Sequence, residues 1–185
     1  LKIENLLFNS LKNIFINKQN INLSLLSELL NIPNLSELES ELTNIDPLKI
    51  QSINKKLNIR LAKNLEKELT NKLIDIEYKI NKIWPKGKEE RKLIQVIWTL
   101  LLYCDNNEYR RKILKYVDSN NMTLSKAALT SFRQFDCIER EKASEKFFDK
   151  WKSNRIVIDN WFLFAASIES QDSAKNLDKL FEHNL

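Results

Sequence analysis

Apolar residues recur every three or four positions along most of the chain, a spacing that predicts helices with one buried face. The longest stripe begins at Asp46-Pro47, where an acidic N-cap followed by proline is typical of a helix start. The pattern predicts one helix of more than thirty residues that ends near Trp84, just before Pro85. Its apolar positions are Ile50, Ile53, Leu57, Leu61, Leu65, Leu69, Leu73, Ile76, Ile80 and Ile83.

Shorter helices are predicted on both sides of the long one. Before it, the pattern indicates helices over 3–14 and 23–30, and Ser36 with Glu39 fits the capping box of a third. After the Pro85-Lys86-Gly87 break, helices are predicted over 89–104, 108–117, 124–135, 137–151, 157–168 and 173–181. Because the joins are short, neighbours should run antiparallel. The expected fold is all-α, an irregular α-solenoid or superhelical array of antiparallel helix pairs without a fixed repeat period.

Composition narrows the fold further. One glycine and three prolines in 185 residues leave little of the turn chemistry that hairpins, phosphate loops and nucleotide-binding crevices require. The length fits one ordinary domain, and 43% hydrophobic residues can fill a core. We therefore expect a single helical domain over residues 1–185.

The formal charge of +5 raises the question of a nucleic-acid or anionic-membrane partner. The 30 basic and 25 acidic residues are interleaved, as in 88–92 and 139–142, which is typical of solvated helix faces with local ion pairs. We expect no nucleic-acid partner. No apolar run reaches the roughly 18 residues of a membrane helix, and the first residues lack a signal-peptide pattern, so we expect no membrane span and a cytoplasmic location.

Residues with catalytic potential are few. Cys104 and Cys137 lie too far apart for a metal knuckle or redox pair and are interpreted as reduced core residues, with a disulfide left open. With His183 as the one histidine, the chain cannot supply the histidine pair of a zinc peptidase. Acid pairs such as Glu139 and Glu145 around Lys142 are interpreted as surface charges. We predict no catalytic, cofactor-binding or metal-binding residue in this chain.

The sequence alone does not decide whether the tryptophans belong to the core or to a binding surface. Trp98, Trp151 and Trp161 fall within predicted helices, where aromatic residues at apolar positions usually belong to the core. Trp84 precedes Pro85 in a predicted loop and is the candidate among the tryptophans for a contact with another domain.

Several short motifs carry a family resemblance. The segment Asn121-Met122-Thr123-Leu124-Ser125-Lys126-Ala127-Ala128-Leu129 resembles the Asn-Met-Thr and Ala-Ala-Leu segment in the C-terminal helical domain of the aminopeptidase N family. Thr123 would be the N-cap of the following helix, and the alanines would permit close helix packing. Further on, Phe147-Phe148-Asp149-Lys150-Trp151 and Val157-Ile158-Asp159-Asn160-Trp161-Phe162 are similar to motifs of the same family, in the same order.

Weaker similarities extend over most of residues 40–185. Ile45-Asp46-Pro47 is similar to the family's Asp-Pro helix start, and residues 91–103 to its Arg-x-Leu helix that ends in Leu-Tyr. The segment Leu180-Phe181-Glu182-His183 resembles the family's Leu-x-x-His, although Asn184 replaces the usual proline.

The resemblance implies part of a zinc-dependent gluzincin aminopeptidase of the membrane alanyl aminopeptidase type, which removes N-terminal residues from peptides. In that family the zinc ligands and the Gly-x-Met-Glu-Asn motif lie in a separate catalytic domain, and neither motif occurs here. The implied partners are the catalytic domain of the same polypeptide and peptide substrates, with zinc held by the parent enzyme and none by this segment. The segment would cap the active-site chamber.

The residues themselves are also compatible with a second class of protein. Helix hairpins and a basic balance are also typical of a stand-alone α-solenoid that binds a protein or peptide. The first residue is Leu1 rather than Met, so we expect the chain to begin inside a longer protein. On the family resemblance, that protein would be a multidomain aminopeptidase.

Overall fold

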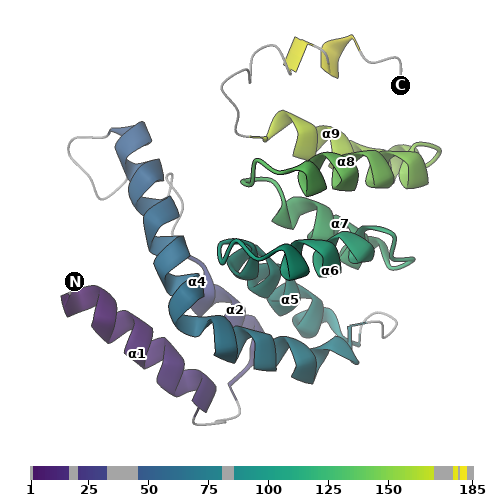
Figure 1. Cartoon of the computed structure of the whole chain (residues 1–185). Helices are drawn as coiled ribbons and strands as arrows, with labels where there is room; N and C mark the ends of the chain where they lie inside the picture. Colours follow the sequence, from purple (N-terminus) through teal and green to yellow (C-terminus); the bar gives the residue numbers. More distant parts are fainter. Residues whose placement is uncertain are drawn as a thin grey trace. The chain divides into compact units, whose positions relative to one another are not determined.

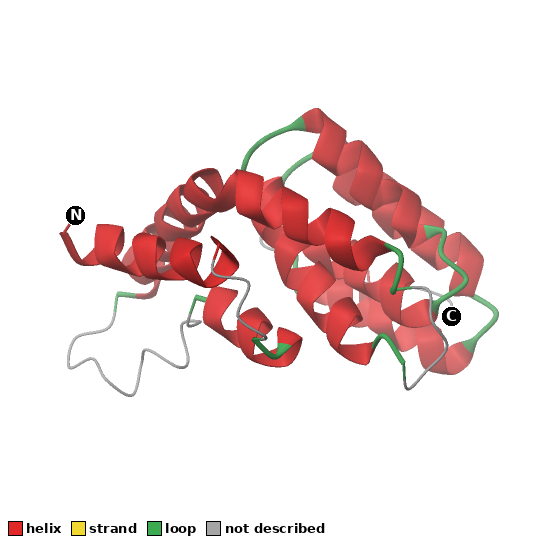
Figure 2. Cartoon of the chain, turned by 90° about the horizontal axis from the view of Figure 1, so that it is seen from below, coloured by secondary structure: helices red, strands yellow, loops and turns green. Residues whose placement is uncertain are grey.

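A computed structural model of the chain describes residues 2–16, 21–32, 46–80, 86–168, 177, 178 and 180–182. Every regular element in these ranges is an α-helix, as Figure 2 shows, which confirms the predicted all-α class. The capping box at Ser36 and Glu39 lies outside the described residues, as does most of the helix predicted over 173–181. The chain divides into two compact units, residues 1–105 and 106–185, each with a core of its own.

The first unit contains α1 (Lys2–Ile16), α2 (Leu23–Leu30), α4 (Pro47–Glu77) and α5 (Lys88–Leu102). α4 packs against α1 and α5, and α2 packs against α5 (Figure 1). The apolar stripes meet in a core that includes Phe8, Leu11, Leu26, Leu30, Leu65, Leu69, Leu93, Ile97 and Trp98. Ion pairs between described helices of this unit include Lys12 with Glu68 at 3.5 Å and Lys92 with Glu28 at 2.5 Å.

α4 begins as predicted but ends sooner than expected. Asp46 is its N-cap, accepting a hydrogen bond from the Lys49 amide at 3.1 Å, and Pro47 occupies the first turn. The helix ends at Glu77, well before Trp84, so the predicted end was wrong. Beyond the helix end, Arg91 is 4% exposed and donates hydrogen bonds to the carbonyls of Ile80 (3.3 Å) and Lys86 (3.0 Å). Those carbonyls meet the guanidinium because the chain has left the helix.

The apolar stripe of α4 winds around the helix axis. The leucines at 57, 61, 65, 69 and 73 follow at intervals of four residues, and each step of four advances by about 40° beyond a full turn. Leu61, Leu65, Leu69, Leu73 and Ile76 are buried. Ile53 was expected in this stripe but is 55% exposed, because its position lies on the side of the helix away from the core.

The second unit contains α6 (Asn107–Val117), α7 (Met122–Ser131), α8 (Ile138–Trp151) and α9 (Arg155–Ala166). α7 packs against α6, α8 and α9, while α8 packs against α6 and α9 (Figure 1). The core contains Ile113, Val117, Leu124, Ala127, Ala128, Leu129, Phe132, Ala143, Phe147, Val157 and Phe164. The short turns between these helices match the antiparallel array predicted from the sequence.

Among the described residues, Gly87 and Asp105 have left-handed backbone, and four of the described helices start with the same kind of cap. Gly87, before α5, has φ 74°, and Asp105, at the end of the first unit, has φ 58°. α2, α6, α7 and α9 each begin after an asparagine whose side chain accepts a hydrogen bond from a backbone amide of the first turn: Asn22, Asn106, Asn121 and Asn154. Of the helices that the structure describes, none is both long and apolar enough to cross a membrane.

Candidate functional site

The motifs that carry the family resemblance come together in the second unit. The Asn121–Leu129 segment forms most of α7, the Phe147–Trp151 segment ends α8, and Val157–Phe162 lies in α9. These three helices pack against one another. Asn121, not the expected Thr123, is the N-cap of α7, because its side chain accepts hydrogen bonds from the amides of Thr123 (3.1 Å) and Leu124 (3.4 Å). Ala127 and Ala128 are buried, as expected for close packing.

Ser125 links three helices through one hydroxyl group. Its side chain is fully buried in α7. The hydroxyl donates to the carbonyl of Val117, the last residue of α6, at 2.6 Å, and accepts from Trp151 Nε1 of α8 at 3.2 Å. Ser125 has no predicted role of its own, because a serine inside a helical pattern carries no signal for a long-range contact. Its position eight residues after a helix end was the feature that could have indicated one.

Lys150 closes the turn between α6 and α7. Its ammonium donates hydrogen bonds to the carbonyls of Asp118 and Ser119, the latter at 2.7 Å, and to the Asn120 side chain at 3.4 Å. One turn earlier on α8, Lys146 forms an ion pair with the Asp118 carboxylate. Positive charge at the end of α6 is favourable because unpaired carbonyls and the helix dipole make that end negative.

An aromatic cluster joins α8 to α9. The rings of Phe148 and Trp161 lie 4.8 Å apart, and Trp161 and Phe162 lie edge to face at 5.0 Å. Trp161 Nε1 donates to the Ser144 hydroxyl at 2.9 Å. Such contacts hold helices together. The motif residues therefore act as packing and capping groups, and none of the contacts described pairs a nucleophile with a general base.

The two cysteines are free and only half-buried, so their expected place in the core was wrong. Burial, reinforced by the nearby Glu66 carboxylate and opposed by Lys63, raises the pKa of Cys104 from 9.0 to about 11. Burial also raises the pKa of Cys137. Because a nucleophilic cysteine needs a lowered pKa, both thiols are poor candidates for catalysis.

The other residues singled out in the sequence have ordinary positions where they are described. Trp98 is fully buried in α5, whereas Trp151 and Trp161 are half-buried in α8 and α9. Of the acids around Lys142, Glu139 lies in the first turn of α8, where it complements the helix dipole, and Glu145 is exposed. Trp84 and His183 lie outside the described residues. Within the described ranges no three His, Cys, Asp or Glu side chains are placed to hold a metal ion.

Packed α-helices make up each unit, which defines an all-α class of protein. Residues 2–185 match the family described as "Domain of unknown function (DUF3458_C) ARM repeats", and the chain belongs to that family. It is similar to aminopeptidase N of Escherichia coli (strain K12), with 26% identity over 171 residues that cover 89% of this chain and 19% of that protein.

The fold is also similar to a crystal structure of Legionella pneumophila aminopeptidase A in complex with aspartic acid. The TM-score is 0.81 with 24% identity, covering 94% of this chain and 22% of that one. The chain thus spans about a fifth of the length of the relatives that it matches.

Proposed function

We propose that this chain is the helical C-terminal part of a larger aminopeptidase, an enzyme that removes N-terminal residues from peptides. The main support is the family match over residues 2–185. The similarity to aminopeptidase N over 89% of the chain points the same way, because it spans both units and nearly every helix. The proposal extends to zinc in the parent enzyme, bound by a catalytic domain on the same polypeptide.

The role proposed for the segment is to cap the active-site chamber and so to limit entry to peptides. The described side chains hold helices together and bind helix ends, as the Ser125 and Lys150 contacts illustrate. This supports a structural role for the segment. We further propose that residues 1–185 belong to one helical domain of the parent and that they bind no metal themselves. The parent is proposed to be a cytoplasmic enzyme of the membrane alanyl aminopeptidase type. Free cysteines support a reducing compartment.

The proposal is tested by comparing the parent polypeptide with the isolated chain. Amino-acid arylamide hydrolysis is measured for both, with zinc and with a chelator. The parent is expected to be active and chelator-sensitive, and the isolated chain inactive. Zinc-dependent turnover by the isolated chain would refute the non-catalytic assignment.

The adjoining coding sequence separates this proposal from the stand-alone binding module. An upstream His-Glu-x-x-His, followed by a further glutamate, is expected next to the chain. A start codon directly before Leu1, together with a parent lacking arylamide hydrolysis, would instead favour the binding module.

A further inference from the structure

The side of α4 that faces away from its core carries a regular row of basic residues. Counting from Lys49, positions separated alternately by four and three residues are Lys49, Ile53, Lys56, Arg60, Lys63, Lys67, Thr70 and Ile74; we call these eight residues the basic seam. At about 100° per residue, all eight except Thr70 fall within roughly 40° of Lys49 around the helix. The buried leucines lie on the other side.

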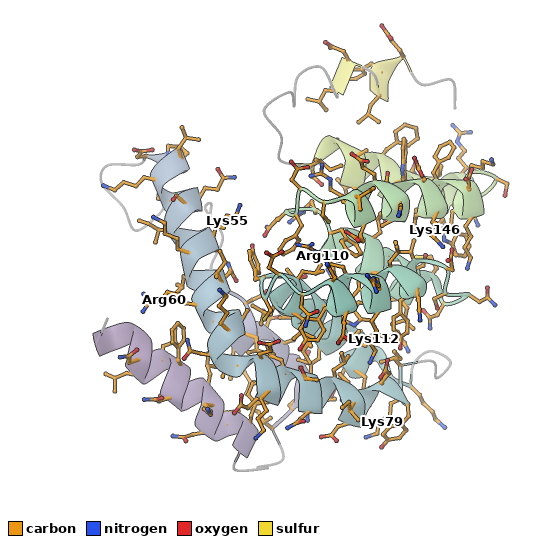
Figure 3. All side chains as sticks on the ribbon, in the orientation of Figure 1. Lys55, Arg60, Lys79, Arg110, Lys112 and Lys146 are labelled. Atoms are coloured by element: carbon orange, nitrogen blue, oxygen red, sulfur yellow. The ribbon has the colours of Figure 1, made fainter. Side chains whose placement is uncertain are left out.

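Four lysines of the seam are exposed to a partner. Lys49, Lys56, Lys63 and Lys67 are exposed, and none of them forms an ion pair with another described residue. Ile53 and Ile74 are 55% and 60% exposed, which is unusual for isoleucine. Figure 3 shows Arg60 and Lys55 on opposite sides of α4, as their positions around the helix require.

The basic seam and the acids Glu66 and Glu68 lie on different sides of α4, although basic and acidic residues alternate along the sequence. The acids Glu66 and Glu68 lie about 100° to either side of the row. Glu68 is already paired with Lys12 of α1 at 3.5 Å. From Lys49 to Lys67 the row is about 27 Å long, at 1.5 Å per residue, and contains no acid.

We propose that the basic seam binds an acidic helix of a partner protein. Alternating steps of four and three residues are the spacing along which a second helix packs, because they keep one line of side chains facing the partner. Carboxylates at the matching positions would meet the lysines. Apolar residues of the partner would cover Ile53 and Ile74, which lie on either side of the charged positions from Lys56 to Lys67 and fix the register.

Other anionic partners fit the surface less well. A helix that lies on a bilayer buries a wide apolar face in the lipid, whereas the apolar side of α4 is buried in the protein. Single-stranded nucleic acid needs aromatic side chains for base stacking, and the seam has none. The flanking acids would also repel a broad anionic surface, but a helix touches only the central line.

The test uses the whole 185-residue chain and a labelled synthetic helix of about 28 residues, four heptads long. This peptide carries Glu at alternating four- and three-residue steps and Leu at the positions facing Ile53 and Ile74. A shuffled peptide has the same composition without the spacing. Fluorescence anisotropy is expected to show about tenfold tighter binding of the matched peptide, weakening from 0.05 to 0.5 M salt (approximate values).

Charge reversal identifies the surface. The variant Lys56→Glu/Lys63→Glu/Lys67→Glu is expected to lose at least about tenfold in affinity for the acidic peptide and to gain binding to a matched lysine peptide. Its control, Lys55→Glu/Lys88→Glu/Lys142→Glu, makes the same charge change at exposed sites off the seam and is expected to bind like the parent chain. Circular dichroism checks folding. If the reversed chain is unfolded, the glutamine variants at 56, 63 and 67 replace it.

Three results would overturn the proposal. The first is equal binding of the matched and shuffled peptides. The second is equal loss of affinity in the seam variant and its control. The third is tighter binding, at the same ionic strength, to phosphatidylserine vesicles or to single-stranded RNA than to the matched peptide.

Discussion

Replacement of Ser125 by alanine tests the packing of the second unit at one atom. The buried hydroxyl donates to the Val117 carbonyl at 2.6 Å and accepts from Trp151 Nε1 at 3.2 Å. Alanine removes both hydrogen bonds, each worth about 1 kcal/mol net, and leaves the Val117 carbonyl without its side-chain donor, at a further cost of about 1–2 kcal/mol. Higher helix propensity returns about 0.5 kcal/mol. The expected loss of stability is therefore about 2.5–3.5 kcal/mol.

Ser131 provides the matched control. It is also buried in α7, but its hydroxyl bonds only to the Ala127 carbonyl of the same helix, at 2.8 Å. That carbonyl keeps its partner within the helix when the hydroxyl is removed. Ser131→Ala should therefore change the free energy of unfolding by less than about 1 kcal/mol, because propensity offsets the lost local bond.

The assay is thermal unfolding followed by tryptophan fluorescence and far-UV circular dichroism. For a unit of about 80 residues, a loss of about 2.5–3.5 kcal/mol lowers Tm by roughly 10–28 °C. Ser131→Ala should shift it by only a few degrees. If both alanine variants unfold at the same temperature, the Ser125 contacts do not contribute as their geometry indicates.

Three further changes probe other contacts. Arg91→Met should destabilise the chain by about 2–4 kcal/mol in urea unfolding, because it removes the buried donor to the Ile80 and Lys86 carbonyls. The control is Lys92→Met at an exposed site, where the expected loss is below about 1 kcal/mol. Equal losses in the two variants would contradict the prediction. The Cys104 thiol has a higher pKa in the folded chain than in the unfolded chain, so the unfolded thiol ionises first as pH rises. The stabilisation that this thiol contributes is therefore present below pH 9 and is lost as pH rises toward about 11. In a Cys137→Ser background, alkylation of Cys104 should therefore have its pH midpoint above 9.0 when folded, and a midpoint at or below that value would refute the burial argument. Lys150→Met should cost about 1–2 kcal/mol by removing the charged donor at the end of α6, measured as Tm, and no change in Tm would show that the contact is not stabilising.

Most helices could be predicted because each carries both a start signal and a periodic apolar face. Residues 23–30 were bounded correctly, and Asp46-Pro47 marked the start of α4. The end of α4 could not be predicted in the same way. The apolar period continues through Ile80, but the helix ends at Glu77, and the Ile80 carbonyl accepts a hydrogen bond from Arg91, eleven residues further on. A contact between distant residues leaves no local signal.

The candidate site was predictable as motifs but not as contacts. The resemblance marked the segments that form α7, the end of α8 and α9, and the structure brings these helices together. Which atoms join them depends on tertiary packing, as the Ser125 hydroxyl shows. The basic seam could not be predicted for another reason. Net charge and the alternation of charges along the sequence count all sides of a helix together, whereas a partner contacts only one side.

The asparagine caps have a consequence for how this sequence can drift. Aspartate offers the same capping oxygen as asparagine, and its charge suits the positive end of a helix. Each of Asn22, Asn106, Asn121 and Asn154 can therefore become aspartate with its helix start retained. Four such changes lower the formal charge from +5 by four. The electrostatic character of this protein is thus free to vary across evolutionary time at positions that still specify where its helices begin.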